Sequence, residues 1–426
     1  MAKRHAVVAG AGIGGLTAAL ALHRRGWDVT VCERAPEPPV TGAGIGLAPN
    51  ALRALDSIGV DAAHAVGSAV PVWMGVRGSG GQWLIRTATA RLASRYGIPP
   101  IAVPRPAFTA ALAAGLPPGT VRHGTAVTGV DQAGGRATVR TAAGPDLPAD
   151  LVVAADGIHS PLRRAHFPGH PGLRYLGETA WRTIVDAPDL RVPAMSETWG
   201  RGARFGVTPL SDGRYYLYAT AVLPAGTRSA DPRAELARRF GSWHDPIPAL
   251  LERIGRLAPA DVLQNDLYDL AAPLPALHRG RIAWLGDAAH AMAPNLGQGG
   301  CQAIEDAVVL AHLLPRSDGA DGPVGTAGAA APTGADPVTT GADPVTTGAD
   351  PVTTGADPVT AALAAYTAAR RDRTDAVRVR ARRAGRLGAL RNPVAAGARD
   401  LAVRATPTRL ALRGMDGLFN GFRLPG

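Results

Sequence analysis

The chain has 426 residues, 46% of them hydrophobic, and contains two cysteines, Cys32 and Cys301. Its length favours two or three lobes with large cores, and no apolar run reaches the roughly 18 residues that a membrane span needs. Two cysteines cannot form a disulfide framework. The sequence therefore predicts a cytoplasmic protein without integral membrane association.

The basic charge is concentrated at one end of the chain. The formal net charge is +11, and residues 361–426 alone contain 14 arginines and four aspartates, a net charge of +10. No zinc-finger or RNA-binding motif accompanies this charge, so we expect no nucleic-acid partner. The helix predicted from Ala361 to Leu390 leaves a membrane surface or a polyanion open as a minor alternative, although contacts to acids of the same protein are the commoner use of such arginines.

The first motif is a glycine turn between a strand and a helix. Gly10, Gly12 and Gly15 follow the apolar run Ala6–Ala9 in G-x-G-x-x-G spacing and open a helical pattern. Such glycines allow a tight turn, let backbone N–H groups approach a diphosphate, and let the helix lie close to the strand. Glu33, at the end of the second strand, is placed to bind a ribose diol. The stretch predicts a site for FAD or NAD rather than NADP.

Several elements follow before the next motif. The small-residue stretch Gly42–Pro49 would let backbone approach a flat ligand, and Asn50 is a plausible N-cap of a short helix. The alternating pattern from Val70 to Arg91, with glycines between Trp73 and Trp83, predicts a β-hairpin. Arg105 precedes a predicted helix, where its guanidinium could reach a phosphate or a carboxylate.

Two further motifs follow buried strands. Asp156-Gly157 ends the strand Asp150–Ala155, and Ser160 and Arg163 come next. This pattern suits a phosphate cradle and a capped helix start equally well. Gly286-Asp287 ends the strand Arg281–Leu285 and precedes His290 and a glycine loop that enters a helix, with Pro294, Gly297, Gln298, Gly299 and Gly300 in that loop.

The rest of the chain is sheet, repeat and helix. Residues 175–225 contain alternating segments that predict antiparallel sheet. Four copies of T-G-A-D-P-V-T run from Thr333 to Thr360, with too little apolar surface to offset the entropy of ordering. We expect residues 315–360 to be a disordered insertion.

Taken in order, the three motifs resemble those of the single-component (class A) FAD-dependent monooxygenases, the p-hydroxybenzoate hydroxylase-like family, nearest the salicylate and 3-hydroxybenzoate hydroxylase branch. The resemblance implies an α/β fold with a Rossmann-like FAD-binding domain of the GR2 type, interleaved with an antiparallel β-sheet substrate domain. It divides the chain into an FAD-binding domain (1–70, 101–174 and 279–314), a substrate domain (71–100 and 175–278), the insertion 315–360, and C-terminal helices (361–426).

The resemblance also implies the cofactor contacts. The glycine turn, Glu33 and Arg34 would hold the ADP half of FAD, Arg105 the diphosphate, the Val127 backbone the adenine, and Asp287 the ribityl and diphosphate region. The Pro294–Gly300 loop would lie against the isoalloxazine ring, and Asp156-Gly157 would serve both FAD and NAD(P)H. The full expected FAD set is Gly10, Gly12, Ile13, Gly14, Gly15, Glu33, Arg34, Gly46, Arg105, Val127, Asp156, Gly157, Asp287, Pro294, Gly297, Gln298, Gly299 and Gly300.

By the same resemblance, NADH or NADPH would visit transiently and reduce the tightly bound FAD. O₂ would then form a flavin C4a-hydroperoxide that hydroxylates or epoxidises an aromatic or polycyclic apolar substrate of secondary metabolism. Within the substrate domain, the positions that would handle the phenol in the hydroxybenzoate branch hold different residues here, which argues against simple hydroxybenzoates. The expected pocket residues are Arg204, Phe205, Thr208 and Tyr216, with Arg182 and Tyr218 as further candidates.

The sequence leaves some alternatives open. No side chain is assigned as catalytic: His290 is expected to orient its loop rather than act as a base, and Cys301 to pack rather than react, although a helix N-terminus lowers a thiol pKa. No metal site is expected. The same fold supports non-oxygenating chemistry or a flavin-binding redox sensor, while the halogenase pattern W-x-W-x-I-P is absent. A monomer or a homodimer is expected.

Overall fold

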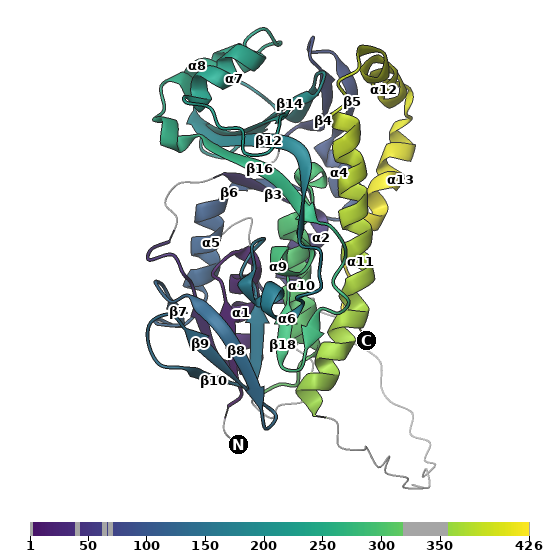
Figure 1. The fold of residues 1–426 in the computed structure, drawn as a ribbon. Helices are drawn as coiled ribbons and strands as arrows, with labels where there is room; N and C mark the ends of the chain where they lie inside the picture. The colour runs from purple at the N-terminus through teal and green to yellow at the C-terminus, as the bar shows by residue number, and fades with distance from the viewer. Residues whose placement is uncertain (1–2, 39–42, 62–65, 67–70, 318–356, 426) are drawn as a thin grey trace, which may run out of the picture.

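The computed structural model describes residues 3–38, 43–61, 66, 71–317 and 357–425. Most of the predicted insertion, residues 318–356, lies outside the described residues. The described chain forms two lobes, and the long helix α11 (Pro358–Gly388) runs alongside both of them (Figure 1). Among the described residues, no helix is long and apolar enough to cross a membrane.

The lower lobe in Figure 1 is built on a six-stranded sheet of order β17-β18-β11-β1-β2-β7. All neighbouring strands are parallel except β17 and β18. The central strands are apolar along nearly their whole length because both of their faces are covered. The strands are β1 (His5–Ala9), β2 (Asp28–Cys32), β7 (Val121–Arg122), β11 (Leu151–Ala154), β17 (His278–Arg279) and β18 (Ile282–Trp284).

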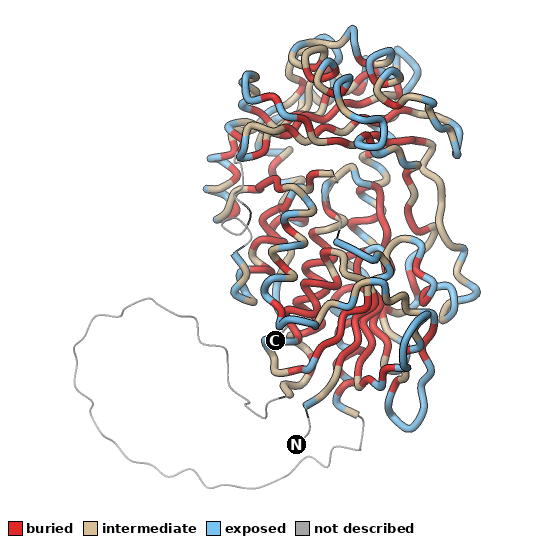
Figure 2. Tube along the Cα trace, turned by 90° about the vertical axis from the view of Figure 1, so that its left-hand side faces the viewer, coloured by how far each residue is buried: buried red, intermediate tan, exposed pale blue. Residues whose placement is uncertain are grey.

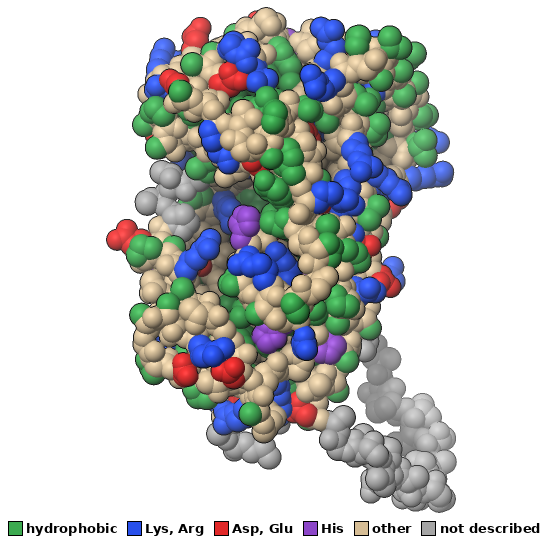
Figure 3. Space-filling view, viewed as in Figure 1, with side chains coloured by type: hydrophobic (Ala, Val, Ile, Leu, Met, Phe, Trp, Pro, Cys, Tyr) green, Lys and Arg blue, Asp and Glu red, His purple; other side chains and the backbone are tan. Residues whose placement is uncertain are grey.

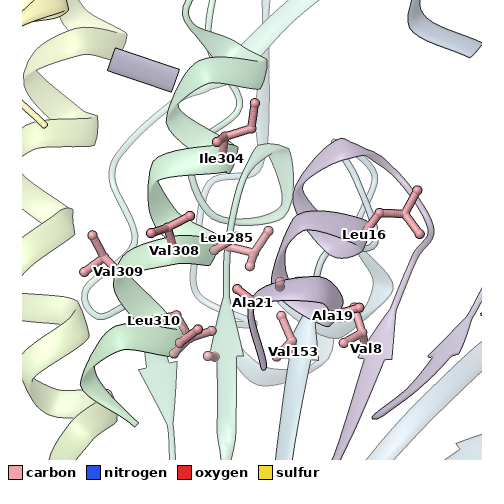
Figure 4. Close-up of a cluster of buried hydrophobic side chains, with 14 of the residues drawn as sticks. Val8, Leu16, Ala19, Ala21, Val153, Leu285, Ile304, Val308, Val309 and Leu310 are labelled. Atoms are coloured by element: carbon pink, nitrogen blue, oxygen red, sulfur yellow. The ribbon is translucent and has the colours of Figure 1, made fainter. Parts of the chain in front are cut away.

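Two helices from distant parts of the sequence cover this sheet. Helix α1 (Ile13–His23) and helix α10 (Gly299–Leu313) pack against each other over the strands, and Figure 4 shows Leu16 and Ile304 from these helices above Val8 and Val153 of the sheet. In Figure 2 the buried residues follow these strands and helices through the lobe. The remaining elements of the lobe are α2 (Pro49–Ser57), α5 (Arg105–Ala114), α6 (Pro161–His166), α9 (Asp287–His290), the 3-10 helix η2 (Pro294–Leu296), the pair β3 (Gly44–Leu47) and β6 (Ile101–Pro104), and the small sheet β8 (Val127–Ala133), β9 (Arg136–Thr141) and β10 (Leu147–Ala149).

The upper lobe is a seven-stranded sheet of order β16-β12-β15-β14-β13-β4-β5. The predicted antiparallel segments and the hairpin between Trp73 and Trp83 are confirmed. The extended pattern predicted through Arg91 is wrong at its end, because a helix begins at Thr89. The elements are β4 (Trp73–Gly78), β5 (Trp83–Ala88), α4 (Thr89–Tyr96), β12 (Leu173–Asp186), β13 (Ala194–Trp199), β14 (Ala203–Pro209), β15 (Arg214–Val222), α7 (Pro232–Phe240), α8 (Ile247–Gly255), the 3-10 helix η1 (Pro259–Asp261) and β16 (Leu263–Leu270).

One face of the upper sheet is closed by α7 and α8. Phe205 and Leu217 of the sheet form a buried cluster with Leu236, Phe240 and Leu250 of these helices. The opposite face looks toward the lower lobe (Figure 1). Because successive side chains of a strand point to opposite faces, only every second residue of the upper sheet can face the lower lobe.

Three helices complete the chain: α11, α12 (Pro393–Ala405) and α13 (Thr408–Phe419). The predicted helix from Ala361 is confirmed, but α11 begins earlier, at Pro358. Asp357 precedes it as N-cap, and its carboxylate accepts a hydrogen bond from the Thr360 backbone N–H at 2.9 Å.

Candidate functional site

The glycine turn after β1 has different steric demands at each position. Gly10 has a φ of 106°, and a Cβ there would lie 2.5 Å from the Ala155 carbonyl oxygen. A Cβ on Gly15 would lie 2.0 Å from the Gly10 carbonyl oxygen, whereas a Cβ on Gly12 would meet nothing within 4 Å. The turn is thus closed toward the protein at Gly10 and Gly15 and open at Gly12, where α1 begins without a side-chain cap.

Glu33 stands at the end of β2, beside this turn. Its carboxylate accepts hydrogen bonds from the backbone N–H groups of Ala11, at 2.8 Å, and Ala35, at 2.9 Å. These bonds fix the carboxylate while leaving lone pairs for a diol. Arg34 follows as an exposed side chain.

A second helix N-terminus lies next to the first. Helix α10 begins at Gly299 with no side-chain cap, and a Cβ on Gly14 of α1 would lie 3.1 Å from the Ala303 Cβ of α10, so the first turns of the two helices are in close contact. Asp287 is exposed at the start of α9, and its Oδ1 lies 4.0 Å from the Cβ position of Gly299. Two groups of free N–H donors therefore lie together, which favours anionic oxygens.

The Asp156 segment is a capped helix start. The Ser160 hydroxyl accepts from the Arg163 N–H at 2.8 Å, and the Arg163 guanidinium is buried, where it donates to the carbonyls of Ala288 and Ile158. Of the two alternatives that the sequence left open here, the capped helix start is confirmed, and the Nη1 and Nη2 donors of Arg163 have carbonyl partners. Asp156 Oδ1 is buried without a partner among the described residues, and burial raises the pKa of this carboxyl.

Other predicted cofactor residues lie in β3, in the loop before α10, at the start of α10, and at the starts of α5 and β8. Gly46 in β3 has an open Cβ position, Gly297 has a φ of 61°, and a Cβ on Gly300 would meet Ile45 Cδ1 at 2.7 Å. Arg105 is exposed at the start of α5, and Val127 is half-buried at the start of β8. The structure thus brings β3 against the first turn of α10.

A buried ionic network beneath the first turns of α10 is absent from the sequence-based expectations. Arg370 of α11 donates to Asp306 at 2.7 Å and to Glu305 at 2.5 Å, and His290 lies 2.5 Å from Asp306. Burial alone would raise the pKa of Asp306, but His290 and Arg370 outweigh it and lower that pKa to about 2. The network attaches α9 and α10 to α11. The sequence analysis anticipated this network only in general terms, as contacts between the arginines of residues 361–426 and acids of the same protein.

The same network corrects the expectation for Asn50. Helix α2 begins at Pro49 with Ala48 as N-cap, and the buried Asn50 amide donates to Glu305 at 2.7 Å and to Gln298 at 3.0 Å. His290 is buried in a structural role, as expected.

Cys301 is a packing residue. It is fully buried, and burial raises its pKa to about 12, which removes the reactivity that a helix N-terminus could have given it. Among the described residues, no group of His, Cys, Asp and Glu side chains could hold a metal ion.

The face of the upper sheet toward the lower lobe is set by strand register. Thr208 pairs with Tyr216 across β14 and β15, and a Cβ on Gly44 of β3 would lie 2.5 Å from the Tyr216 ring, so this tyrosine reaches the lower lobe. Phe205 has the opposite orientation: its ring packs against Phe240 of α7, with ring centroids 5.3 Å apart. Phe205 therefore does not line the space between the lobes, contrary to the prediction. Figure 3 shows the surface hollowed between the lobes.

A buried polar cluster lies on the same face. Because Gly206 has no side chain, the Tyr218 ring lies across it, and the Tyr218 hydroxyl donates to Glu197 at 2.7 Å. Arg204 is buried and donates to Glu178 at 2.6 Å. Burial, reinforced by the Glu197 charge, raises the pKa of Tyr218 well above its usual value, so its phenol stays protonated.

Arg204 also joins the two lobes. Its guanidinium contacts the side-chain amide of Asn295 in η2, the segment just before α10, and the amide oxygen can accept from it when the amide is turned toward it. A Cβ on Gly388 of α11 would lie 2.7 Å from Arg204 Cδ, so this helix also passes close by. The upper sheet is thereby connected to the loop that precedes α10.

These features suit a dinucleotide. The two adjacent uncapped helix starts suit a diphosphate, and the carboxylates of Glu33 at the end of β2 and Asp287 at α9 suit two sugar-like parts. Residues 3–317 match the family model described as an FAD binding domain. The chain is 38% identical, over 72% of its length and 80% of the relative's, to the aurachin C monooxygenase/isomerase of Stigmatella aurantiaca. It is 35% identical, over 73% and 82%, to the FAD-dependent urate hydroxylase of Klebsiella pneumoniae.

A solved structure is also similar. The structure of Klebsiella pneumoniae HpxO complexed with FAD and uric acid superposes with a TM-score of 0.82 at 28% identity, covering 99% of this chain and 98% of that one. The chain therefore belongs to the FAD-binding-domain family and is a class A FAD-dependent monooxygenase that uses NAD(P)H.

Proposed function

We propose that the protein hydroxylates a fused, nitrogen-containing aromatic ring system. The proposal is supported by the names of its relatives, which include an aurachin C monooxygenase, a urate hydroxylase and a 2-heptyl-3-hydroxy-4(1H)-quinolone synthase. The observation that carries it is the position of Tyr216, which faces the lower lobe across Gly44. A substrate ring bound on this face of the sheet would lie within reach of the Tyr216 phenol.

The FAD would be held by the six-stranded sheet lobe. The N–H groups at the open Gly12 position and at Gly299 would bind the diphosphate, Glu33 the adenosine ribose, and Asp287 the ribityl chain. Bound FAD supplies the redox chemistry, namely reduction by NAD(P)H and activation of O₂ for transfer of one oxygen atom. The positive end of α10 would stabilise negative charge on the nearby ring system.

The substrate would be oriented by the upper sheet. Burial raises the pKa of Tyr216, with the Arg182 charge opposing the shift, so its hydroxyl remains a donor at neutral pH. Such a donor suits a ring carbonyl or hydroxyl oxygen of the substrate, and the buried Arg204 cluster behind it excludes water. In the same proposal the protein acts in the cytoplasm as a monomer or homodimer.

The test is a matched pair of variants on β15. Tyr216→Phe should leave FAD content unchanged, raise KM at least tenfold and lower the product formed per NAD(P)H oxidised. Tyr215→Phe is the control, because Tyr215 lies on the other face and its hydroxyl donates to the Leu190 carbonyl. Fused heteroaromatic compounds would be screened for substrate-stimulated NAD(P)H oxidation, with ¹⁸O₂ label followed into the product. If KM and the product formed per NAD(P)H oxidised are the same in both variants, Tyr216 does not contact the substrate.

A further inference from the structure

Helices α4 and α13 form a basic cleft that the monooxygenase reaction does not use. The cleft has a volume of about 390 Å³ and is lined by Arg91, Ser94, Arg95, Arg409, Leu412 and Arg413. Its four arginines are exposed at the surface. In Figure 3 basic side chains gather at the right-hand edge, where Figure 1 places α13.

Among the residues that the structure describes, the acid Asp416 lies beside this cleft. Asp416 is held by Arg95, through hydrogen bonds of 2.8 and 2.5 Å, and by the Tyr96 hydroxyl at 3.0 Å. In the described parts of the chain, no carboxylate forms an ion pair with Arg91, Arg409 or Arg413. Arg91, Arg409 and Arg413 therefore line the cleft without an ion pair to a described carboxylate. Hydrogen bonds from Arg95 lower the pKa of Asp416 most, and among the other three arginines Arg413 is close enough to lower that pKa further. An anionic oxygen group would stabilise such an excess of positive charge.

The adjoining helix presents apolar side chains to solvent. Val394 and Leu401 of α12 are seven residues apart, on one face, and are 79% and 68% exposed. Leu410, beside Arg409 on α13, is 58% exposed. Exposed aliphatic residues are ordinary when single, but these three belong to the consecutive helices α12 and α13, and α13 also carries Arg409 and Arg413.

We propose that this surface, defined by Arg91, Arg409, Arg413, Val394, Leu401 and Leu410, docks on an anionic phospholipid membrane. Exposed arginines combined with exposed aliphatic side chains are the features with which surface helices bind lipid: the guanidiniums bind headgroup phosphates and the aliphatic groups enter the headgroup–acyl boundary. A second copy of this chain is disfavoured because it would bring like charges together. Nucleic acid is disfavoured because the aliphatic side chains gain nothing from its hydrated backbone.

The experiment is co-sedimentation of the FAD-loaded protein with vesicles of phosphatidylcholine alone or mixed equally with phosphatidylglycerol. Binding should be at least tenfold tighter to the anionic vesicles and should weaken as salt rises. The double variant Arg409→Glu/Arg413→Glu should lose at least tenfold in affinity for anionic vesicles. Val394→Ser/Leu401→Ser should weaken binding without removing its salt dependence.

The matched control is Arg191→Glu/Arg256→Glu, which makes the same charge change at two other exposed arginines. Arg256 is the C-cap of α8, and Arg191 follows Asp189, which pairs with Arg253 of α8. Figure 1 places α8 on the other side of the upper lobe from α12. The flavin absorbance spectrum and thermal unfolding of each variant show that it is folded. The proposal is overturned by no vesicle binding, by equal binding to neutral and anionic vesicles, or by an equal loss in the control. It is also overturned if inorganic phosphate binds the cleft in calorimetry while vesicles do not, or if Val394→Ser/Leu401→Ser converts a dimer to a monomer.

Discussion

Alanine at two glycines of the same turn should impair two different properties: the stability of the apoprotein at Gly15 and the affinity for FAD at Gly12. At Gly15 a methyl group would lie 2.0 Å from the Gly10 carbonyl oxygen, more than 1 Å inside normal contact, and neither atom belongs to a flexible side chain. Alanine gains about 1 kcal/mol in helix propensity, but overpacking against rigid backbone costs about 3 kcal/mol, the upper end of the usual range. Gly15→Ala should therefore destabilise the protein even without FAD.

At Gly12 the protein has room for the methyl group, because nothing lies within 4 Å of its Cβ position and its φ of −74° suits alanine. The loss of a favourable N-cap residue costs at most about 1 kcal/mol. If the open space is where the FAD diphosphate lies, the methyl group displaces it from the backbone donors. Loss of one charge-assisted hydrogen bond or two, about 3 kcal/mol, corresponds to a roughly 100-fold rise in Kd.

The assay prepares both variants without flavin, measures urea unfolding, and titrates FAD by the quenching of its fluorescence. The expected result is near-natural apoprotein stability with weak FAD binding for Gly12→Ala, and low apoprotein stability for Gly15→Ala. If Gly12→Ala binds FAD within threefold of the natural protein, the diphosphate does not lie at the start of α1 and the reasoning fails.

Three other changes test the rest of the site. Gly206→Ala places a Cβ 2.0 Å from the Tyr218 ring, so product formed per NAD(P)H should fall severalfold in coupled assays while FAD binding is unchanged. Arg370→Met removes the cation that Glu305 and Asp306 share, and leaves Glu305 with Arg373 and Asp306 with His290. It should cost about 3 kcal/mol in urea unfolding; a cost below about 1 kcal/mol would contradict the network. Because the pKa of Asp306 is lowered to about 2 from 3.8, its contribution is complete above about pH 4 and is lost as pH falls toward 2. Acid unfolding of Asp306→Asn should lack that part of the pH dependence.

The sequence by itself determined the chemistry of the cofactor lobe. Residues from Gly10 to Glu33 belong to one continuous strand, turn, helix and strand. Their spacing along the chain therefore fixes their positions in space: the glycines allow the tight turn, and the acid lies at the end of the next strand. The buried strands before Asp156 and Gly286 were predictable for the same reason, since a strand covered on both faces is apolar throughout.

Only the tertiary structure decided what lies between elements far apart in the chain. Alternation along β14 allowed Phe205 or Thr208 to face the lower lobe, and the packing of α7 on one face settled it. The contacts of Arg370 with Asp306 and of Arg204 with Asn295 join segments separated by 64 and more residues. No local pattern encodes such pairs, because a buried charge acquires its partner only when the fold brings an opposite charge to it.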